Sequence, residues 1–88
     1  MKIKVIEQPT KIYFCEIYRI TITIDGCKYS LVINDNDNGC EYEVEPQPTS
    51  EEVRMALDQF VHYSYVVGSD NSWKEAKEGD ELEIYYEL

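Results

Sequence analysis

The strongest constraint on the fold of this chain is an Asp-Gly pair, Asp25-Gly26, set between two stretches of alternating apolar and polar residues. Both central residues of a type I′ turn need a positive φ angle, and an Asp-Gly pair meets that need, so it predicts a tight β-hairpin. Before the pair, Ile20, Ile22 and Ile24 alternate with polar residues, with the period of a half-buried strand. Residues 18–24 therefore form the first arm of the hairpin.

The register of this hairpin follows from the same residues. With Asp25 and Gly26 as the two loop residues, four cross-strand pairs are apolar: Ile24 with Cys27, Ile22 with Tyr29, Ile20 with Leu31, and Tyr18 with Ile33. A slip by one residue would set isoleucines against Lys28 and Ser30. Burial of the apolar face therefore selects the first register.

A second hairpin is predicted through residues 34–39. With Asn38-Gly39 as its turn, Ile33 faces Val44 and Asp35 faces Tyr42. Alternation then directs three carboxylates to the other face: Glu41, Glu43 and Glu45.

Upstream, residues 2–7 are expected to form a strand, and residues 12–17 to lead into the strand that starts at Tyr18. Glu16 interrupts the even-numbered apolar face, which predicts a bulge or bend near Cys15-Glu16.

The sheet is expected to stop at Pro46-Gln47-Pro48, and a helix to follow over residues 50–62. Thr49 and Glu52 have the spacing of a capping box, with Thr49 as the N-cap. The helix end is left open between His62 and Val67, because β-prone residues precede Gly68.

A further helical turn is expected at residues 73–77, and a last strand at residues 81–88. Alternation directs Leu82, Ile84, Tyr86 and Leu88 inward. The predicted fold is an α+β domain spanning residues 1–88, an antiparallel meander of four to five strands with one amphipathic helix packed on one face.

The chain of 88 residues carries a net charge of -10, from 18 acidic and 8 basic residues. Because Lys and Arg neutralise phosphates, this balance argues against direct nucleic-acid binding. Residues 1–33 hold only three acids against five bases, so the negative charge lies after residue 33. Such asymmetry is typical of electrostatic partner selection.

The strand pattern indicates which acidic residues share a face and are therefore candidate binding residues. Each of two strands presents a carboxylate row on one face: Glu41, Glu43 and Glu45 on one, and Glu81, Glu83 and Glu87 with Tyr85 between them on the other. Loop acids extend the area: Asp35, Asp37, Asp70, Glu78 and Asp80. These rows have two interpretations, a solvated face that aids solubility and a surface for a basic partner. Like charges in one row repel and Glu is a poor strand former, which favours the second.

The remaining motifs indicate no cofactor and no metal. Residues 34–45 match a calcium loop superficially, but Asn34 stands where Asp is wanted, and strands rather than helices are expected on both sides. The three cysteines lack zinc spacing and are interpreted as reduced thiols, with Cys27 packed on the apolar face. His62 is the sole imidazole, and without a nucleophile motif an enzyme ranks below a binding protein.

Small size, strong acidity, a short antiparallel meander with one helix, and no active-site motif together resemble small phage-encoded inhibitors of host defence. The resemblance is to the anti-CRISPR and DNA-mimic types, and it concerns overall character, so it assigns no residue a role. It implies a cytoplasmic inhibitor in an infected host cell, with a CRISPR effector as one class of partner.

Two functions therefore stand as expectations. The first is a non-enzymatic inhibitor whose acidic face blocks a basic nucleic-acid-binding groove of another protein, by competition. The alternative is a structural or adaptor domain that forms a homodimer through an edge strand, with its charge serving solubility. The start of the chain lacks the apolar region of a signal peptide, and no apolar run is long enough for a membrane span, so the protein is expected in the cytoplasm with no membrane partner.

Overall fold

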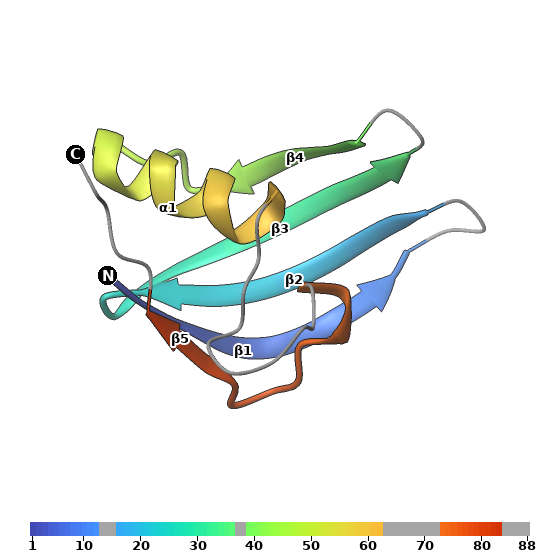
Figure 1. Cartoon of the computed structure of the whole chain (residues 1–88), viewed down its shortest axis with the longest axis horizontal. Helices are drawn as coiled ribbons and strands as arrows, with labels where there is room; N and C mark the ends of the chain where they lie inside the picture. Colours follow the sequence, from blue (N-terminus) through green and yellow to red (C-terminus); the bar gives the residue numbers. More distant parts are fainter. Residues whose placement is uncertain (13–15, 37–38, 63–72, 84–88) are drawn as a thin grey trace.

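Among the residues that the structure describes, five strands form one antiparallel sheet, and one α-helix lies against one of its faces (Figure 1). A computed structural model of the chain describes residues 1–12, 16–36, 39–62 and 73–83. Its elements are β1 (Lys2–Lys11), β2 (Ile17–Ile24), β3 (Cys27–Asn36), β4 (Gly39–Glu45), α1 (Glu51–His62), the short 3-10 helix η1 (Trp73–Glu75) and β5 (Glu81–Glu83). The strand order is β4-β3-β2-β1-β5, so a four-strand meander is followed by a strand that returns beside β1. The predicted α+β fold is confirmed.

The hairpin between β2 and β3 has the predicted turn and register. Asp25 has a φ of 49° and Gly26 a φ of 87°, and Ile22 pairs with Tyr29 as the apolar pattern requires. The turn is also tied to β1, because the Asp25 carboxylate accepts a hydrogen bond from the Lys2 N–H and the Asp25 N–H donates to the Lys2 carbonyl, each at 2.9 Å. One turn thus aligns three strands.

The predicted register of the second hairpin is wrong by two residues. Ile33 pairs with Tyr42 rather than Val44, and Leu31 pairs with Val44. A slip by two keeps every side chain on its predicted face, so alternation alone does not detect it. In the observed register Leu31 and Ile33 both lie opposite strand residues of β4, whereas the predicted register would have set Leu31 opposite Pro46, after the end of β4.

The β1 strand is longer than predicted and is irregular in its second half. The register against β2 shifts between Val5 and Glu7 and again between Glu7 and Thr10, a stretch that contains Pro9, which has no N–H for the ladder. The strand expected from Tyr18 begins one residue earlier, at Ile17, and the Ile12 N–H donates to the Ile17 carbonyl at 2.8 Å, which closes the β1–β2 connection. Glu16 therefore breaks the apolar pattern at a turn, while residues 13–15 lie outside the described part.

The predicted helix is confirmed as α1, with its N-cap moved by one residue. The Arg54 N–H donates to the Ser50 carbonyl at 3.2 Å, so Ser50 rather than Thr49 accepts the first helical bond. The helical turn expected at residues 73–77 is the shorter η1, and β5 is the start of the strand expected at residues 81–88. The end of the helix after His62 and the residues after Glu83 lie outside the described part.

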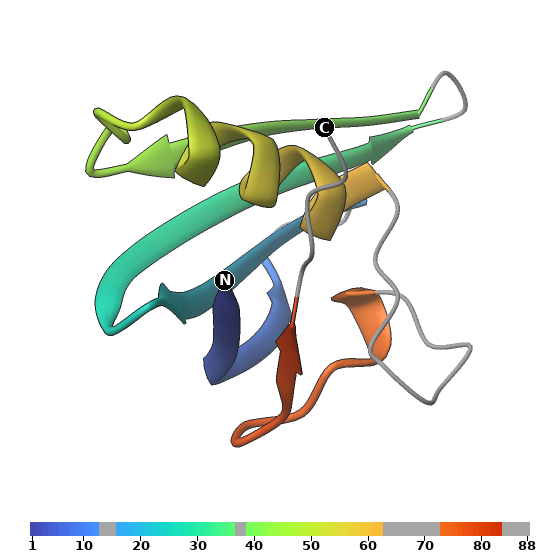
Figure 2. The same ribbon diagram turned by 60° about the vertical axis from the view of Figure 1, so that its left-hand side comes forward.

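The core fills the space between one face of the sheet and α1. Figures 1 and 2 place α1 alongside β3 and β4, while η1 lies near β1. The side chains at the centre are nearly inaccessible to solvent: Ile3, Val5, Ile20, Ile22, Ile24, Leu31 and Ile33 from the sheet, and Ala56, Leu57 and Phe60 from α1. Cys27, expected on this face, is exposed, because its position beside the turn leaves it at the end of the sheet. No helix among the described residues is long and apolar enough to span a membrane.

The Asp25 turn supplies a first test of this fold. We expect Asp25→Ala to lower the free energy of unfolding by about 1–3 kcal/mol, because Ala at positive φ costs about 1–2 kcal/mol and the bond from Lys2 is lost. Asp25→Asn keeps an acceptor and tolerates this conformation, so it should cost clearly less. Urea denaturation of both variants measures the difference, and equal losses would contradict the role given to the turn.

Candidate partner-binding surface

The two predicted carboxylate rows lie at opposite edges of the sheet (Figure 1). Glu41, Glu43 and Glu45 are exposed on β4, and they point away from α1 because Tyr42 and Val44 face the core. Glu81 and Glu83 are exposed on β5, with three strands between the two rows. At about 4.8 Å per strand spacing, the rows are roughly 19 Å apart.

Basic side chains occupy the middle of the face opposite α1. Arg19 and Lys28 belong to the central strands, and they line a hollow of about 460 Å³ together with Glu43 and Glu45. The remaining lining residues are Glu7, Thr21, Ser30 and Val32. The structure therefore does not join the two predicted rows into one acidic face. It has an acidic β4 edge, a mixed centre and an acidic β5 edge.

The two edges also differ in how their carboxylates are paired. On the β5 side, the Lys2 ammonium lies 3.1 Å from the Glu81 carboxylate. On the β4 side, the carboxylates of Glu41, Glu43 and Glu45 form no ion pair or hydrogen bond with any described residue. We call these three residues the β4 row; it is the part of the predicted surface without a direct ion pair among the described residues, although Arg19 and Lys28 line the same hollow as Glu43 and Glu45.

Two other predicted site residues have structural partners. Asp80 accepts a hydrogen bond from the Lys77 N–H at 2.9 Å, within the turn before β5. Asp35 forms an ion pair with Lys74 of η1, and the Cys40 thiol donates to its carboxylate at 3.4 Å. The bond from Lys74 holds the pKa of Asp35 below its ordinary value. Asp37, Asp70, Tyr85 and Glu87 lie outside the described residues.

Glu16, the residue that interrupts the apolar pattern of the sequence, organises a charged cluster. Its carboxylate accepts a hydrogen bond from the Tyr18 hydroxyl at 2.6 Å and lies 3.0 Å from the Lys11 ammonium. These two bonds, the Tyr18 one being the larger, lower the pKa of Glu16 to about 2. Lys74 is 3.6 Å from the same carboxylate and 5.2 Å from the centre of the Tyr18 ring. The cluster thus ties η1 to β2, and its acids are paired with lysines of the same chain.

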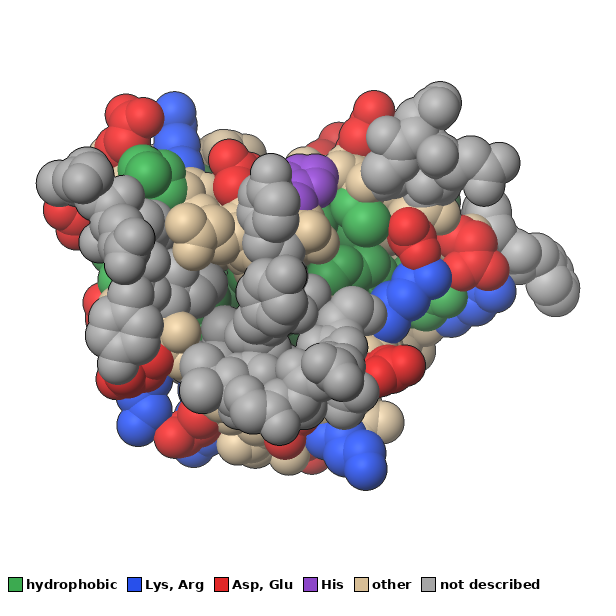
Figure 3. All heavy atoms as spheres, in the orientation of Figure 1, with side chains coloured by type: hydrophobic (Ala, Val, Ile, Leu, Met, Phe, Trp, Pro, Cys, Tyr) green, Lys and Arg blue, Asp and Glu red, His purple; other side chains and the backbone are tan. Residues whose placement is uncertain are grey.

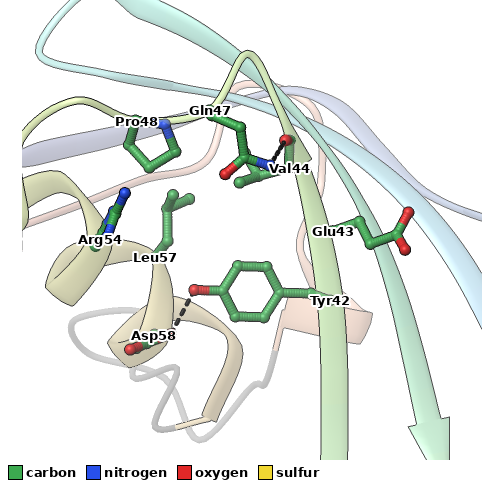
Figure 4. A pocket seen from close by; sticks show the side chains of 8 residues that line it. All are labelled: Tyr42, Glu43, Val44, Gln47, Pro48, Arg54, Leu57 and Asp58. Carbon is green, nitrogen blue, oxygen red and sulfur yellow. Dashed lines mark hydrogen bonds between the residues drawn. The ribbon is translucent and has the colours of Figure 1, made fainter.

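A groove beside β4 was not anticipated from the sequence. It has a volume of about 360 Å³ and runs between β4 and α1 (Figure 4). The Tyr42 side chain reaches across to α1, where its hydroxyl donates to the Asp58 carboxylate, and burial is the main reason that the pKa of Tyr42 is raised. The Gln47 amide donates to the Val44 carbonyl at 3.2 Å, whereas Glu43 points to the opposite side (Figure 4).

The groove has mixed walls. Pro48 and Leu57 supply apolar surface, and Arg54 and Asp58 supply charge along α1. The sequence contains one signal of it, since Gln47 lies between two prolines that hold the chain after β4. The groove also depends on the register of the second hairpin and on the position of α1 against β4. Strand alternation and helical periodicity in the sequence specify neither of these.

On the face that carries α1, described acidic and basic side chains are spaced around the periphery (Figure 3). Among the described residues, no three His, Cys, Asp or Glu side chains lie close enough together to hold a metal ion.

No protein-family model matches this sequence, and comparisons with curated proteins and with solved structures likewise find no match.

The Glu16 cluster leads to a prediction about acid stability. The pKa of Glu16 is about 2 in the folded chain against 4.5 as the ordinary value, so the unfolded chain binds this proton first as the pH falls. The stabilisation is complete above pH 4.5 and is lost towards pH 2. We expect Tyr18→Phe to raise the pKa of Glu16, measured by NMR titration of the carboxyl carbon. An unchanged pKa in that variant would show that the hydroxyl bond is not its cause.

The β4 row leads to a prediction about stability without a partner. Replacing Glu43, the central carboxylate, removes repulsion from its two neighbours at about 6.6 Å and introduces a better strand former. We expect Glu43→Thr to raise the free energy of unfolding by about 0.2–1 kcal/mol at low salt, with the gain shrinking at high salt. Glu75→Thr is the control on η1. A Glu43→Thr variant less stable than the parent would mean that the row is compensated within the chain.

Proposed function

We propose that this protein is a non-enzymatic inhibitor that places the β4 row in a basic nucleic-acid-binding groove of another protein. The observation that carries the proposal is the state of that row: three exposed carboxylates with no ion pair among the described residues, on a strand at the edge of the sheet.

The argument is energetic. A row of like charges with no internal partner destabilises the folded chain, and a basic partner would reverse the sign of that contribution. Glu16, Asp35 and Glu81 show that this chain pairs carboxylates with lysines where the fold needs them. The exposed and unpaired condition of the β4 row is therefore better explained by an intermolecular contact than by a structural one.

The mechanism is competition. Residues two apart on a strand present their carboxylates about 6.6 Å apart, a spacing similar to that of successive phosphates. Lys and Arg side chains that line a nucleic-acid groove would bind this row in place of the phosphates. A CRISPR effector in the cytoplasm of an infected cell is the partner class that the resemblance implies. Association should be fast at low salt, and affinity should fall as salt rises.

The proposed contact is narrower than the surface expected from the sequence. The β5 carboxylates are separated from the β4 row by strands that carry Arg19 and Lys28, and Glu81 is paired with Lys2. Asp35 and Asp80 likewise have partners within the chain. We assign binding to the β4 row and assign structural roles to these other acids.

A charge-reversal series tests the proposal. The triple variant Glu41→Lys, Glu43→Lys, Glu45→Lys should lose inhibition of a target's binding to labelled DNA or RNA, measured by fluorescence anisotropy. Candidate targets are identified by a pull-down from bacterial lysate on the immobilised protein, with elution in a salt gradient. The matched control is Glu51→Lys, Glu75→Lys, Glu78→Lys, which changes three exposed residues and alters the net charge equally.

The control should retain most of the inhibition, and so should the β5 variant Glu81→Lys, Glu83→Lys. Circular dichroism confirms that each variant is folded. Full inhibition by the β4 triple variant, or equal loss in the control, would refute the assignment to the β4 row.

The homodimer alternative has a weaker physical basis at β4. Pairing of β4 with a second copy of itself would bring two carboxylate rows together on one face, which is unfavourable. Size-exclusion chromatography with light scattering distinguishes the two functions, because a stable dimer without affinity for basic proteins would favour the structural role.

A further inference from the structure

The exposed edge of β4 offers backbone hydrogen-bonding groups as well as charge. In an antiparallel pair, successive residues direct their backbone N–H and C=O groups alternately towards the neighbouring strand and away from it. The β3–β4 pairing closes at Asn36 and Gly39, which form the hydrogen-bonded pair of a two-residue hairpin. Counting from that pair, Cys40, Tyr42 and Val44 direct their backbone groups away from β3.

An independent contact confirms this direction. The Gln47 side chain, which is not part of the ladder, donates to the Val44 carbonyl at 3.2 Å (Figure 4). The Val44 carbonyl therefore points away from β3, towards the open side of β4. No described residue bonds the outward groups of Tyr42, so within the described part of the chain the edge is open at Tyr42 and partly covered at Val44.

The two sides of this edge differ in chemistry. On the side facing α1, the groove of about 360 Å³ is lined by Val44, Pro48 and Leu57 among others. On the other side lie the carboxylates of the β4 row. A strand added to this edge would direct alternate side chains into the groove and the others towards the carboxylates.

We propose that β4 accepts an added antiparallel strand from its partner, an extended segment with Lys or Arg at alternate positions and small apolar residues between them. This inference rests on the proposed function, because it specifies how the basic partner contacts the β4 row. Main-chain hydrogen bonds would supply affinity and the alternation would supply specificity, as in other cases of strand addition.

Charge complementarity selects this occupant over a second copy of the chain. The basic residues of the added strand would lie opposite Glu41, Glu43 and Glu45, whereas a second β4 would bring like charges to the same positions. On the groove side, the Tyr42 hydroxyl of β4 bonds the Asp58 carboxylate of α1, and Val44, Pro48 and Leu57 supply apolar surface for the apolar residues of the added strand.

Backbone-methylated peptides provide a sharp test. The probe is a seven-residue peptide of alternating Lys and Val with blocked ends, and its binding to the full chain is measured by calorimetry at low salt. In an antiparallel addition the Val residues lie opposite Tyr42 and Val44 and direct their N–H groups towards β4, while the Lys N–H groups point away. N-methylation of the Val residues should weaken binding at least tenfold, and N-methylation of the Lys residues should change it less than twofold.

A peptide of the same composition with all Lys residues in one block should also bind at least tenfold more weakly. Amide chemical-shift changes should concentrate at Cys40, Tyr42 and Val44 and spare Glu81 and Glu83. Equal affinities across the methylated and block peptides would overturn the proposal, since charge alone would then account for binding. A dimer that occupies β4 in the free protein would overturn it as well.

Gln47 allows a test from the protein side. Gln47→Ala removes the side chain that competes for the Val44 carbonyl, so the alternating peptide should bind about two- to tenfold more tightly. Unchanged or weaker binding would contradict strand addition at Val44. The test of the added strand can fail while the proposed function holds. If the triple variant of Glu41, Glu43 and Glu45 loses inhibition but peptide methylation has no effect, the acidic contact is supported and the added strand is refuted.

Discussion

The burial of one face of the β2–β3 hairpin is the interaction on which the other features of this protein depend. Ile20, Ile22 and Ile24 are 2 % exposed or less, and each buried side chain of this size contributes about 1.5–3 kcal/mol. Because side chains alternate along a strand, placing these residues inward directs Arg19, Thr21 and Thr23 outward. The Asp25-Gly26 turn holds that register and, through its bonds to Lys2, aligns β1 with it.

The carboxylates of this chain fall into two groups that composition does not distinguish. Glu16, Asp35 and Glu81 face lysines, and the first two have lowered pKa values because of hydrogen bonds to their carboxylates. The β4 row has no such partner among the described residues. Negative charge thus serves the fold in one group, where it ties η1 and β5 to the central strands. In the other it lacks such partners, and the repulsion expected within the row gives the proposed contact with a basic partner its physical basis.

Both proposals concern the same strand for the same reason. An edge strand exposes backbone groups that the interior strands of the sheet satisfy with their neighbours, and β4 combines that edge with the unpaired row. Gln47 bonds one of these backbone groups, and no residue in the described ranges bonds the outward groups of Tyr42. A groove of about 360 Å³ with apolar and polar walls lies beside the same edge. Charge, main-chain bonding and shape therefore converge on one element.

Local patterns were sufficient for most of the secondary structure. The type I′ turn, the strand alternation and the helical stripe over residues 50–62 each rest on interactions between residues near in sequence, so the chain alone specified β2, β3, α1 and the outward direction of Glu41, Glu43 and Glu45. It failed where two arrangements satisfy the same pattern: the second hairpin slipped by two residues without moving any side chain to the other face. Which acids are paired, and the separation of the β4 and β5 rows, depend on contacts between distant segments. β5 returns beside β1 rather than β4, and Lys74 reaches Asp35 across the fold; such placements are decided by packing of the whole core, which no local periodicity encodes.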